Sequence, residues 1–434
     1  MSKERIAIMT NFDSLNTAYS LVSIVKDQIK MFKRYDHEVF LFTNSVFDHK
    51  YDDGIEPITS MPFIHLKDYK SVAELTPEHG EIAIPAIKEA VKKIIEDFKI
   101  DIVLTHDLIF TGWNMPYALA IQEISKEMKE DKEWKKIGWF HWVHSVPNIV
   151  NQDGQATPRD WWIMQNFLAN HKIVFPNKVD LQRVAEAWRT NIGAVRHVPH
   201  IKDLRTWYDF SEETCEIIDE YPGIMESQIV QIYPASTDRI EAKGLIQILA
   251  IFANFKLRGA SVCLVVANQN AKDREELIKR YRTIANGYNL TKDEFIFTSE
   301  IKTEYQPGIS KRILRELQLC SNIFIYPTHE ESFGLVGPEA AHAGCFMVLN
   351  KSLNVIAEVF EHQGLYADFG SFHNHVNIVD PSKYYAELAD IISARMMNNE
   401  ALTTRTLCRL KFNMDTLYHK YYAPILMERV LWKT

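Results

Sequence analysis

The segment 322–349 constrains the possible fold of this chain more than any other. It begins with a short apolar run at residues 323–326, long enough for a buried strand, and Pro327 ends that strand because it has no N–H to donate. A short helix of small residues is expected at 338–344, with proline in its first turn and glycine at its end. The apolar run 345–349 predicts a second strand. This order of strand, loop, helix and strand predicts a parallel α/β sheet.

Apolar runs and helical patterns alternate in the same way along the rest of the chain. Before residue 200, strands are expected at residues 5–12, 37–43, 101–106, 136–142, 172–176 and 195–199. After residue 225, strands are expected at residues 228–233, 261–267, 294–298 and 365–369, besides the two in segment 322–349. The acidic stretch 201–224 is expected to be an irregular linker, and helices are expected from residue 382 to the end. The alternation predicts two doubly wound parallel sheets.

Length and composition agree with this division. A chain of 434 residues is too long for one ordinary core, so two domains are expected. The net charge of −8 gives no global sign of binding to nucleic acid or to an anionic membrane. Five scattered cysteines form no C-x-x-C pair, which favours reduced thiols in a cytoplasmic protein. The start of the chain has no apolar signal segment, and no apolar run is long enough to span a membrane.

The loop between the two strands of segment 322–349 carries the clearest chemical signal. Ligands of open α/β sheets bind outside the carboxyl ends of the strands, and here two acids, Glu331 and Glu339, stand with seven residues between them. The string Glu-Ser-Phe-Gly-Leu followed by Glu-Ala-Ala-His-Ala-Gly resembles the signature of retaining GT-B glycosyltransferases of the family 4 type. The resemblance implies that Glu331 lies by the transferred sugar and that Glu339 holds the nucleotide ribose. It also implies a covering role for the backbone of Phe333, Gly334, Leu335 and Val336.

The resemblance also implies an architecture of two Rossmann-like domains that face a cleft. Residues 1–205 would form the acceptor-side domain and residues 206–412 the nucleotide-sugar domain. Residues 413–434 would form a helix that packs back on the first domain. One departure is at residues 11–16, where family members usually place two adjacent glycines and this chain has none.

Cations expected at the donor diphosphate follow the first strand of the second half. The stretch 238–244 resembles the family pattern Gly-Arg-Leu-x-x-x-Lys-Gly, although the first glycine is absent and the interval from arginine to lysine is one residue shorter. The resemblance assigns Lys243 and Arg239 to the diphosphate, whose departing charge a transferase has to stabilise. No Asp-x-Asp motif occurs, so a metal-independent reaction without cofactor is expected.

Other candidate residues are more dispersed. The family places a histidine at a strand end near the donor sugar, which falls on His141 or, as the second choice, on His144. Glu300 lies in the loop expected to contact the nucleobase. The neighbouring Trp161 and Trp162 are candidates for stacking on an acceptor, although such a pair is more often part of a core or a lid.

These residues predict a retaining glycosyltransferase that moves a sugar from a UDP- or GDP-linked donor to a hydroxyl acceptor. The acceptor is left open between a glycan, a lipid-linked molecule, a small molecule and a hydroxylated DNA base. Two alternatives share the fold: a nucleotide-sugar epimerase or phosphorylase, and a protein that binds nucleotide-sugar without turnover. Fold alone does not decide between them.

Overall fold

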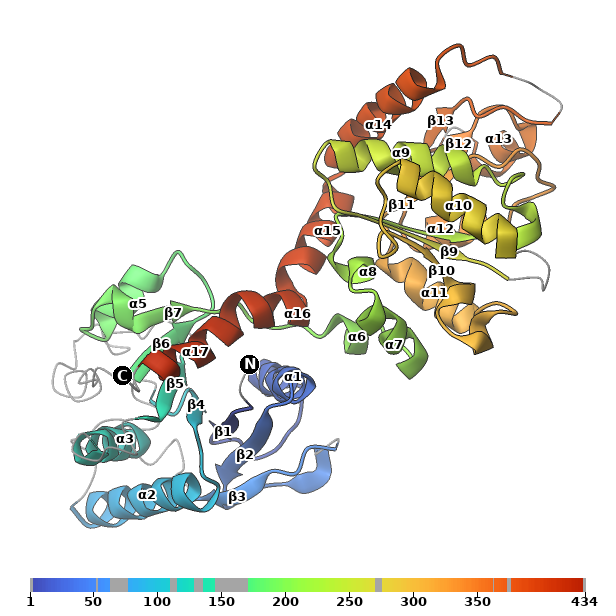
Figure 1. Cartoon of the computed structure of the whole chain (residues 1–434). Coiled ribbons are helices and arrows are strands. Elements are labelled where there is room, and N and C mark those ends of the chain that lie inside the picture. The colour runs from blue at the N-terminus through green and yellow to red at the C-terminus, as the bar shows by residue number, and fades with distance from the viewer. Residues whose placement is uncertain are drawn as a thin grey trace. The chain divides into compact units, whose positions relative to one another are not determined.

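The computed structural model describes residues 3–51, 54–62, 77–109, 115–128, 136–144, 171–269, 275–361, 363–372 and 376–431 (Figure 1). The chain divides into two compact units. Unit 1 comprises Met1–Lys202 and Met414–Thr434, and unit 2 comprises Asp203–Asn413. Each unit is built on parallel strands with helices between them, which confirms the predicted α/β class. No helix among the described residues is long and apolar enough to cross a membrane.

Unit 1 contains a seven-stranded parallel sheet in the order β3-β2-β1-β4-β5-β6-β7. Its strands are β1 (Arg5–Met9), β2 (Glu38–Asn44), β3 (Ile58–Met61), β4 (Ile102–His106), β5 (Gly138–Trp142), β6 (His171–Phe175) and β7 (Val195–His197). Its helices are α1 (Ser20–Arg34), α2 (Pro77–Asp97), α3 (Met115–Met128), α5 (Leu181–Ala187), α16 (Met414–Leu417), the π-helical segment Tyr418–Tyr422 and α17 (Ala423–Leu431).

The sheet of unit 1 is covered on both faces, which explains why its strands are almost continuously apolar. Helices α2 and α3 lie side by side over one face (Figure 1) and bury residues such as Ile87 and Ile121 against it. Helix α1 and the C-terminal segment cover the other face. There Tyr418 and Tyr422 are buried, and the Tyr418 hydroxyl lies 2.7 Å from His37 Nε2. The C-terminal segment is therefore part of the core of unit 1.

Unit 2 contains two three-stranded parallel sheets, β10-β9-β8 and β11-β12-β13. The strands are β8 (Ile229–Pro234), β9 (Val262–Ala267), β10 (Phe295–Phe297), β11 (Ile323–Tyr326), β12 (Phe346–Asn350) and β13 (Leu365–Ala367). The helices are α6 (Leu204–Trp207), α7 (Glu212–Glu220), α8 (Gly223–Glu226), α9 (Leu245–Leu257), α10 (Glu275–Gly287), α11 (Lys311–Cys320), α12 (Val336–His342), α13 (Asn354–Phe360), α14 (Pro381–Met397) and α15 (Glu400–Phe412).

Side chains join the two sheets of unit 2 between β8 and β11. The buried Gln231 amide donates to the Ile325 carbonyl at 3.0 Å and accepts from the Ile325 N–H at 2.9 Å. Asn322 pairs with Val230 through a backbone bond and a side-chain bond. The resulting strand order, β10-β9-β8-β11-β12-β13, reverses its direction of growth between β8 and β11. Ligands of open α/β sheets bind at such a switch point.

The expected irregular linker is largely helical, so that prediction was wrong. Residues 204–226 form α6, α7 and α8, and Ile217 and Ile218 of α7 are buried in a core cluster with Leu317. The acids of α7 concealed this apolar face in the sequence. Helix α12 also differs in detail, because it begins at Val336, two residues before the expected start at Pro338.

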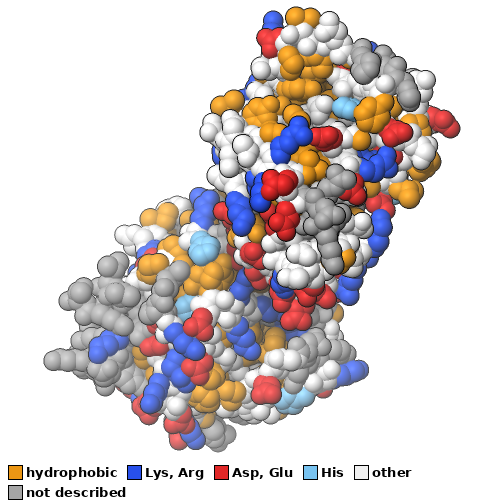
Figure 2. All heavy atoms as spheres, turned by 45° about the vertical axis from the view of Figure 1, so that its right-hand side comes forward, with side chains coloured by type: hydrophobic (Ala, Val, Ile, Leu, Met, Phe, Trp, Pro, Cys, Tyr) orange, Lys and Arg blue, Asp and Glu red, His pale blue; other side chains and the backbone are white. Residues whose placement is uncertain are grey.

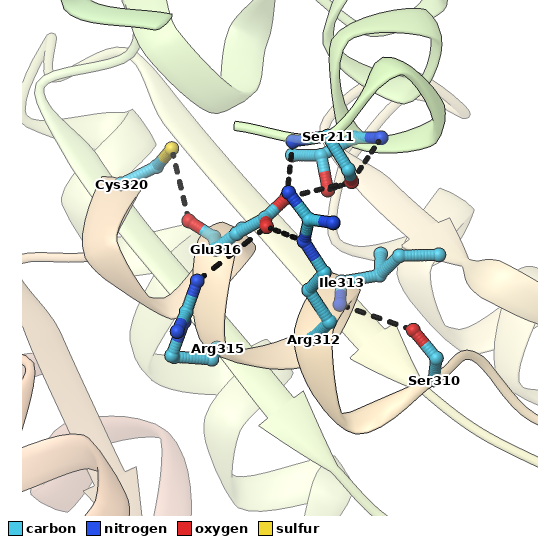
Figure 3. A network of polar contacts seen from close by, with 8 residues as sticks. Ser211, Ser310, Arg312, Ile313, Arg315, Glu316 and Cys320 are labelled. Carbon is cyan, nitrogen blue, oxygen red and sulfur yellow. Dashed lines mark hydrogen bonds and ion pairs between the residues drawn. The ribbon is translucent and has the colours of Figure 1, made fainter. Parts of the chain in front are cut away.

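A buried carboxylate fixes this helical stretch to α11 (Figure 3). Glu316 is fully buried and accepts hydrogen bonds from the Ser211 N–H at 2.8 Å, the Ser211 hydroxyl at 2.7 Å and Arg312 Nε at 2.8 Å. Burial alone would raise the pKa of Glu316, but hydrogen bonds from Thr214, Ser211 and Arg312 outweigh it and lower the pKa to about 2. The ionised form is therefore the one that the fold stabilises.

Replacing Glu316 by glutamine is expected to destabilise unit 2 by about 2–3 kcal/mol, since hydrogen bonds to a buried charge are lost. Because the folded-state pKa is depressed, the contribution is present above about pH 4.5 and is lost as the pH falls toward 2. Urea unfolding of both proteins at pH 7 measures the difference. Glu304→Gln, at an exposed acid, is the control, and equal losses in both variants would contradict the assignment.

Candidate active site

A pocket of about 660 Å³ lies in unit 2 at the carboxyl ends of β8, β9 and β11. It is therefore located at the switch point of the strand order, where the fold favours ligand binding. Three segments contribute to its wall: residues 234–243 after β8, residues 267–269 after β9 and residues 331–336 after β11. Residues 308–314, at the start of α11, complete the lining. The pocket therefore contains most of the residues that the sequence singled out.

Lys243 and Glu331 form the central ion pair of this pocket. Both side chains are nearly buried, with 12% and 10% of their surfaces exposed, and Lys243 Nζ contacts Glu331 Oε1. The Tyr326 hydroxyl donates to the same Oε1 at 2.5 Å. A lysine and an acid that are 88 residues apart in sequence thus meet inside the pocket. A cation in a partly water-excluded site interacts with an anionic ligand more strongly than it would in water.

The two loops that bear this pair lie directly against each other. The His329 N–H donates to the Ala242 carbonyl at 2.8 Å, and the Tyr233 hydroxyl donates to the Lys243 carbonyl at 2.6 Å. Gly244 has φ of +69°, and a Cβ there would lie 2.6 Å from the Pro327 carbonyl oxygen. Only glycine fits this close approach without a shift of backbone. The local sequence therefore holds Lys243 at a fixed position.

Two further cation–acid pairs lie at the pocket and are more exposed. Arg239 is 3.5 Å from Glu330, and both side chains are more than half exposed. Lys311 Nζ is 3.0 Å from Glu339 Oε1, and Glu339 Oε2 is buried without a hydrogen-bond partner among the described residues. Glu339 does not itself line the pocket, although Lys311 does. The second acid of the signature is thus anchored through one oxygen only.

The loop before α12 supplies the rest of the expected donor contacts. Phe333, Gly334, Leu335 and Val336 all line the pocket. Phe333 and Leu335 are exposed, although they are large and apolar. Glu300 lies elsewhere: it does not line the pocket, and Arg282 Nε donates to its carboxylate at 3.1 Å. The structure thus brings together most of the expected donor residues and separates Glu300 from them.

His141 lies inside the sheet of unit 1. Its side chain is fully buried on β5, Nδ1 is 2.8 Å from the Thr105 hydroxyl, and Nε2 is 2.7 Å from His171 Nδ1. Burial lowers the pKa of His141 to about 3. Both ring nitrogens are already hydrogen bonded, so this imidazole is a core residue that offers no free nitrogen to a ligand.

His144 lies just after β5, at the carboxyl edge of the same sheet. Its Nε2 is 3.0 Å from His106 Nδ1, its ring stacks on His200, and its Nδ1 is buried without a partner among the described residues. Burial, with a smaller contribution from His200, lowers the pKa of His144 to about 3. The adjacent Asp107 accepts from the His144 N–H at 3.2 Å, and burial raises the pKa of Asp107 to about 6.

This second cluster therefore consists of uncharged imidazoles next to an acid with a perturbed pKa, which is a feature common at functional sites. No group of three or more acids, histidines or cysteines within the described ranges is arranged to hold a metal ion. Trp161 and Trp162 lie outside the described residues.

Sequence reasoning missed Tyr233 and Tyr326, the two buried tyrosines that contact the central pair. A signal was present, because the tripeptide Ile-Tyr-Pro occurs at the ends of both β8 and β11. In both cases the tyrosine hydroxyl donates to the loop that follows its strand, from Tyr233 to the Lys243 carbonyl and from Tyr326 to Glu331 Oε1. The repeat therefore marks the two strands of the switch point, whose following loops carry Lys243 and Glu331.

Comparison with known proteins gives only weak similarities. No family model matches the chain. Over 161 residues the chain is 25% identical to the uncharacterized glycosyltransferase YqgM of Bacillus subtilis, which is 37% of this chain and 38% of that relative. The match thus spans well under two thirds of the relative's length.

Two solved structures align over nearly the full chain at low similarity. A glycosyltransferase from Rickettsia africae is 14% identical, with a TM-score of 0.38, and 99% of each chain is covered. Anabaena HepE in complex with UDP is 13% identical, with a TM-score of 0.34, and the alignment covers 98% of this chain and 100% of HepE.

Proposed function

We propose that this chain is a retaining glycosyltransferase that uses a nucleotide-diphosphate sugar and needs no metal ion. The observation that carries the proposal is the nearly buried Lys243–Glu331 pair in a pocket at the switch point of unit 2. A cation there is placed to stabilise a departing diphosphate, and the adjacent acid is placed to contact the sugar. The partial likeness to a Bacillus subtilis glycosyltransferase supports the same reading.

In the proposed reaction, the bond from the anomeric carbon to the diphosphate oxygen breaks as the bond to the acceptor hydroxyl forms. The departing phosphate oxygen takes the acceptor proton, so no separate general base is required. Lys243 and Arg239 neutralise the diphosphate, and Glu331 orients the sugar. Glu339 holds the ribose, while Phe333 to Val336 cover the donor. Unit 2 is the donor side and unit 1 the acceptor side in this proposal.

The histidine role that the resemblance implies falls on His144 rather than on His141. Both nitrogens of the His141 ring are hydrogen bonded inside the sheet, whereas His144 Nδ1 has no partner among the described residues. A neutral imidazole with a free nitrogen accepts a hydrogen bond from a sugar hydroxyl. Substituting His144 is therefore expected to reduce turnover without unfolding the sheet.

The acceptor is proposed to be a hydroxyl of a glycan, a lipid-linked molecule or a small molecule. Figure 2 shows basic and acidic side chains interspersed over the face in view, and the net charge is −8. A DNA acceptor requires phosphate neutralisation by an excess of basic groups. The net charge and the mixed surface therefore favour a glycan, a lipid-linked molecule or a small molecule over a hydroxylated DNA base.

Release of nucleotide from a panel of UDP- and GDP-linked sugars tests the proposal, with and without EDTA. We expect slow hydrolysis of one donor, unchanged by EDTA, and a loss of nucleotide affinity of about tenfold in Glu339→Ala, since a hydrogen bond to a charged group is removed. Glu387→Ala, at an exposed acid of α14, is the control. Failure to bind or turn over any donor would overturn the proposal. Recovery of an epimerised donor without nucleotide release would identify an epimerase instead.

A further inference from the structure

Tyr326 contacts Glu331, but it has no role in the reaction proposed above. It is the last residue of β11, its side chain is fully buried, and its hydroxyl donates to Glu331 Oε1 at 2.5 Å. Lys243 contacts that same oxygen. Glu331 Oε2 has no hydrogen-bond partner among the residues that the structure describes. Two donors on one oxygen restrict rotation of the carboxylate and leave the other oxygen available to a ligand hydroxyl.

Gly334 gives the Tyr326 hydroxyl its space. Gly334 has φ of +81°, and a Cβ at this position would lie 2.6 Å from the Tyr326 hydroxyl oxygen and 3.3 Å from its Cε1. A contact of 2.6 Å is far inside van der Waals range, and one of the two residues would have to shift. The buried Tyr326 side chain thus requires a glycine at position 334 of the Phe-Gly-Leu string, independently of any requirement from a ligand.

We propose that Tyr326 is a positioning residue: packed under Gly334, it fixes Glu331 so that Oε2 faces the sugar of the donor. This inference rests on the proposed function for its catalytic consequence, although its structural part stands without it. Tyr326 does not touch the reacting atoms in this scheme. It acts by removing the alternative orientations of Glu331, which a transferase would otherwise have to exclude at each turnover.

The catalytic part predicts a specific kinetic pattern for Tyr326→Phe, which deletes only the hydroxyl. We expect kcat to fall about 10- to 100-fold, the loss of one hydrogen bond to a charged group, while KM for the donor and the affinity for free nucleotide stay within about twofold. Tyr281→Phe is the matched control, because its buried hydroxyl has no partner among the described residues. Loss of nucleotide affinity together with kcat would show a general distortion of the pocket and overturn the positioning role.

The structural part is tested by coupling to Gly334 and needs no activity. Gly334→Ala is expected to lower Tm by several degrees, through strain at positive φ and the clash with the hydroxyl. In the Tyr326→Phe background, Gly334→Ala is expected to lower Tm by about half as much, because the hydroxyl that would lie closest to the new Cβ is absent. Equal Tm losses in the two backgrounds would overturn the inference. Coupled Tm losses in a protein that binds no nucleotide would instead leave the packing correct and the proposed function wrong.

Discussion

Replacing Lys243 by methionine is expected to lower turnover of the donor about 100- to 1,000-fold, the loss typical for one electrostatic stabiliser of a transition state. The lysine is nearly buried against Glu331, so its charge is only partly screened by water. Methionine keeps much of the aliphatic stem and removes the ammonium group. Steady-state nucleotide release by the wild type and the variant, at saturating donor, measures the effect.

The variant also leaves Glu331 without its cation, so stability has to be separated from catalysis. Removing one member of a buried ion pair is costly, because the remaining charge stays uncompensated. The double variant Lys243→Met with Glu331→Gln is expected to regain most of the lost stability and none of the turnover. Lys256→Met serves as the control, since Lys256 pairs with Glu294 at 2.6 Å outside the pocket. Turnover restored in the double variant would mean that Lys243 acts only through the fold.

Mild acid is expected to destabilise unit 1 strongly. The pKa of His141 is lowered to about 3 by burial, whereas in the unfolded chain it is about 6.5. The unfolded state therefore binds more protons, so the stability contribution is complete above pH 6.5 and is lost as the pH falls toward 3. At pH 5, which is 1.5 units below the unfolded-state pKa, protonation of this one histidine in the unfolded chain lowers the free energy of unfolding by about 2 kcal/mol, at about 1.4 kcal/mol for each pKa unit. His171 and His106, also fully buried with lowered pKa, shift stability in the same direction.

Denaturant unfolding at pH 7.5, 6 and 5 tests this expectation. His141→Gln keeps a polar side chain that does not titrate, so its stability should be lower at pH 7.5 but should decline less between pH 7.5 and pH 5. His419→Gln is the control, because this ring lies near the surface beside Tyr35. Parallel pH profiles for wild type and His141→Gln would contradict the assignment. The window also separates this effect from that of Glu316, which acts only below about pH 4.5.

Much of the fold follows from the sequence because strands buried on both faces are nearly continuous apolar runs. β1, β8 and β11 are of this kind: β8 and β11 lie within one residue of their predicted bounds, and β1 begins at Arg5 as predicted but ends at Met9, three residues early. Helix α7 was missed for the opposite reason, since its apolar side is narrow and acids dominate the rest. What holds it is Glu316, about a hundred residues further along the chain, and no local pattern reveals that contact.

The candidate donor site was predictable where residues follow strand ends in the sequence, and it was not predictable where contacts between distant segments decide. Lys243 and Phe333 to Val336 line the pocket as expected, because they belong to the segments that follow β8 and β11 at the switch point. The contact between Lys243 and Glu331 joins residues 88 positions apart, and no sequence pattern predicts it. His141 was the preferred histidine by motif, yet the register of β5 against β4 and β6 turns it between Thr105 and His171.

The junction between β8 and β11 has a geometric consequence for the pocket. The two loops that carry Lys243 and Glu331 leave from these strands, and the Gln231 amide spans the strands with one bond in each direction. The length of the Gln231 side chain thus constrains the distance between β8 and β11, and with it the distance between the loops that carry Lys243 and Glu331. A shorter amide at this position would draw the walls together or separate the bonds. The distance between these two walls of the pocket therefore depends on a residue that is not part of its lining.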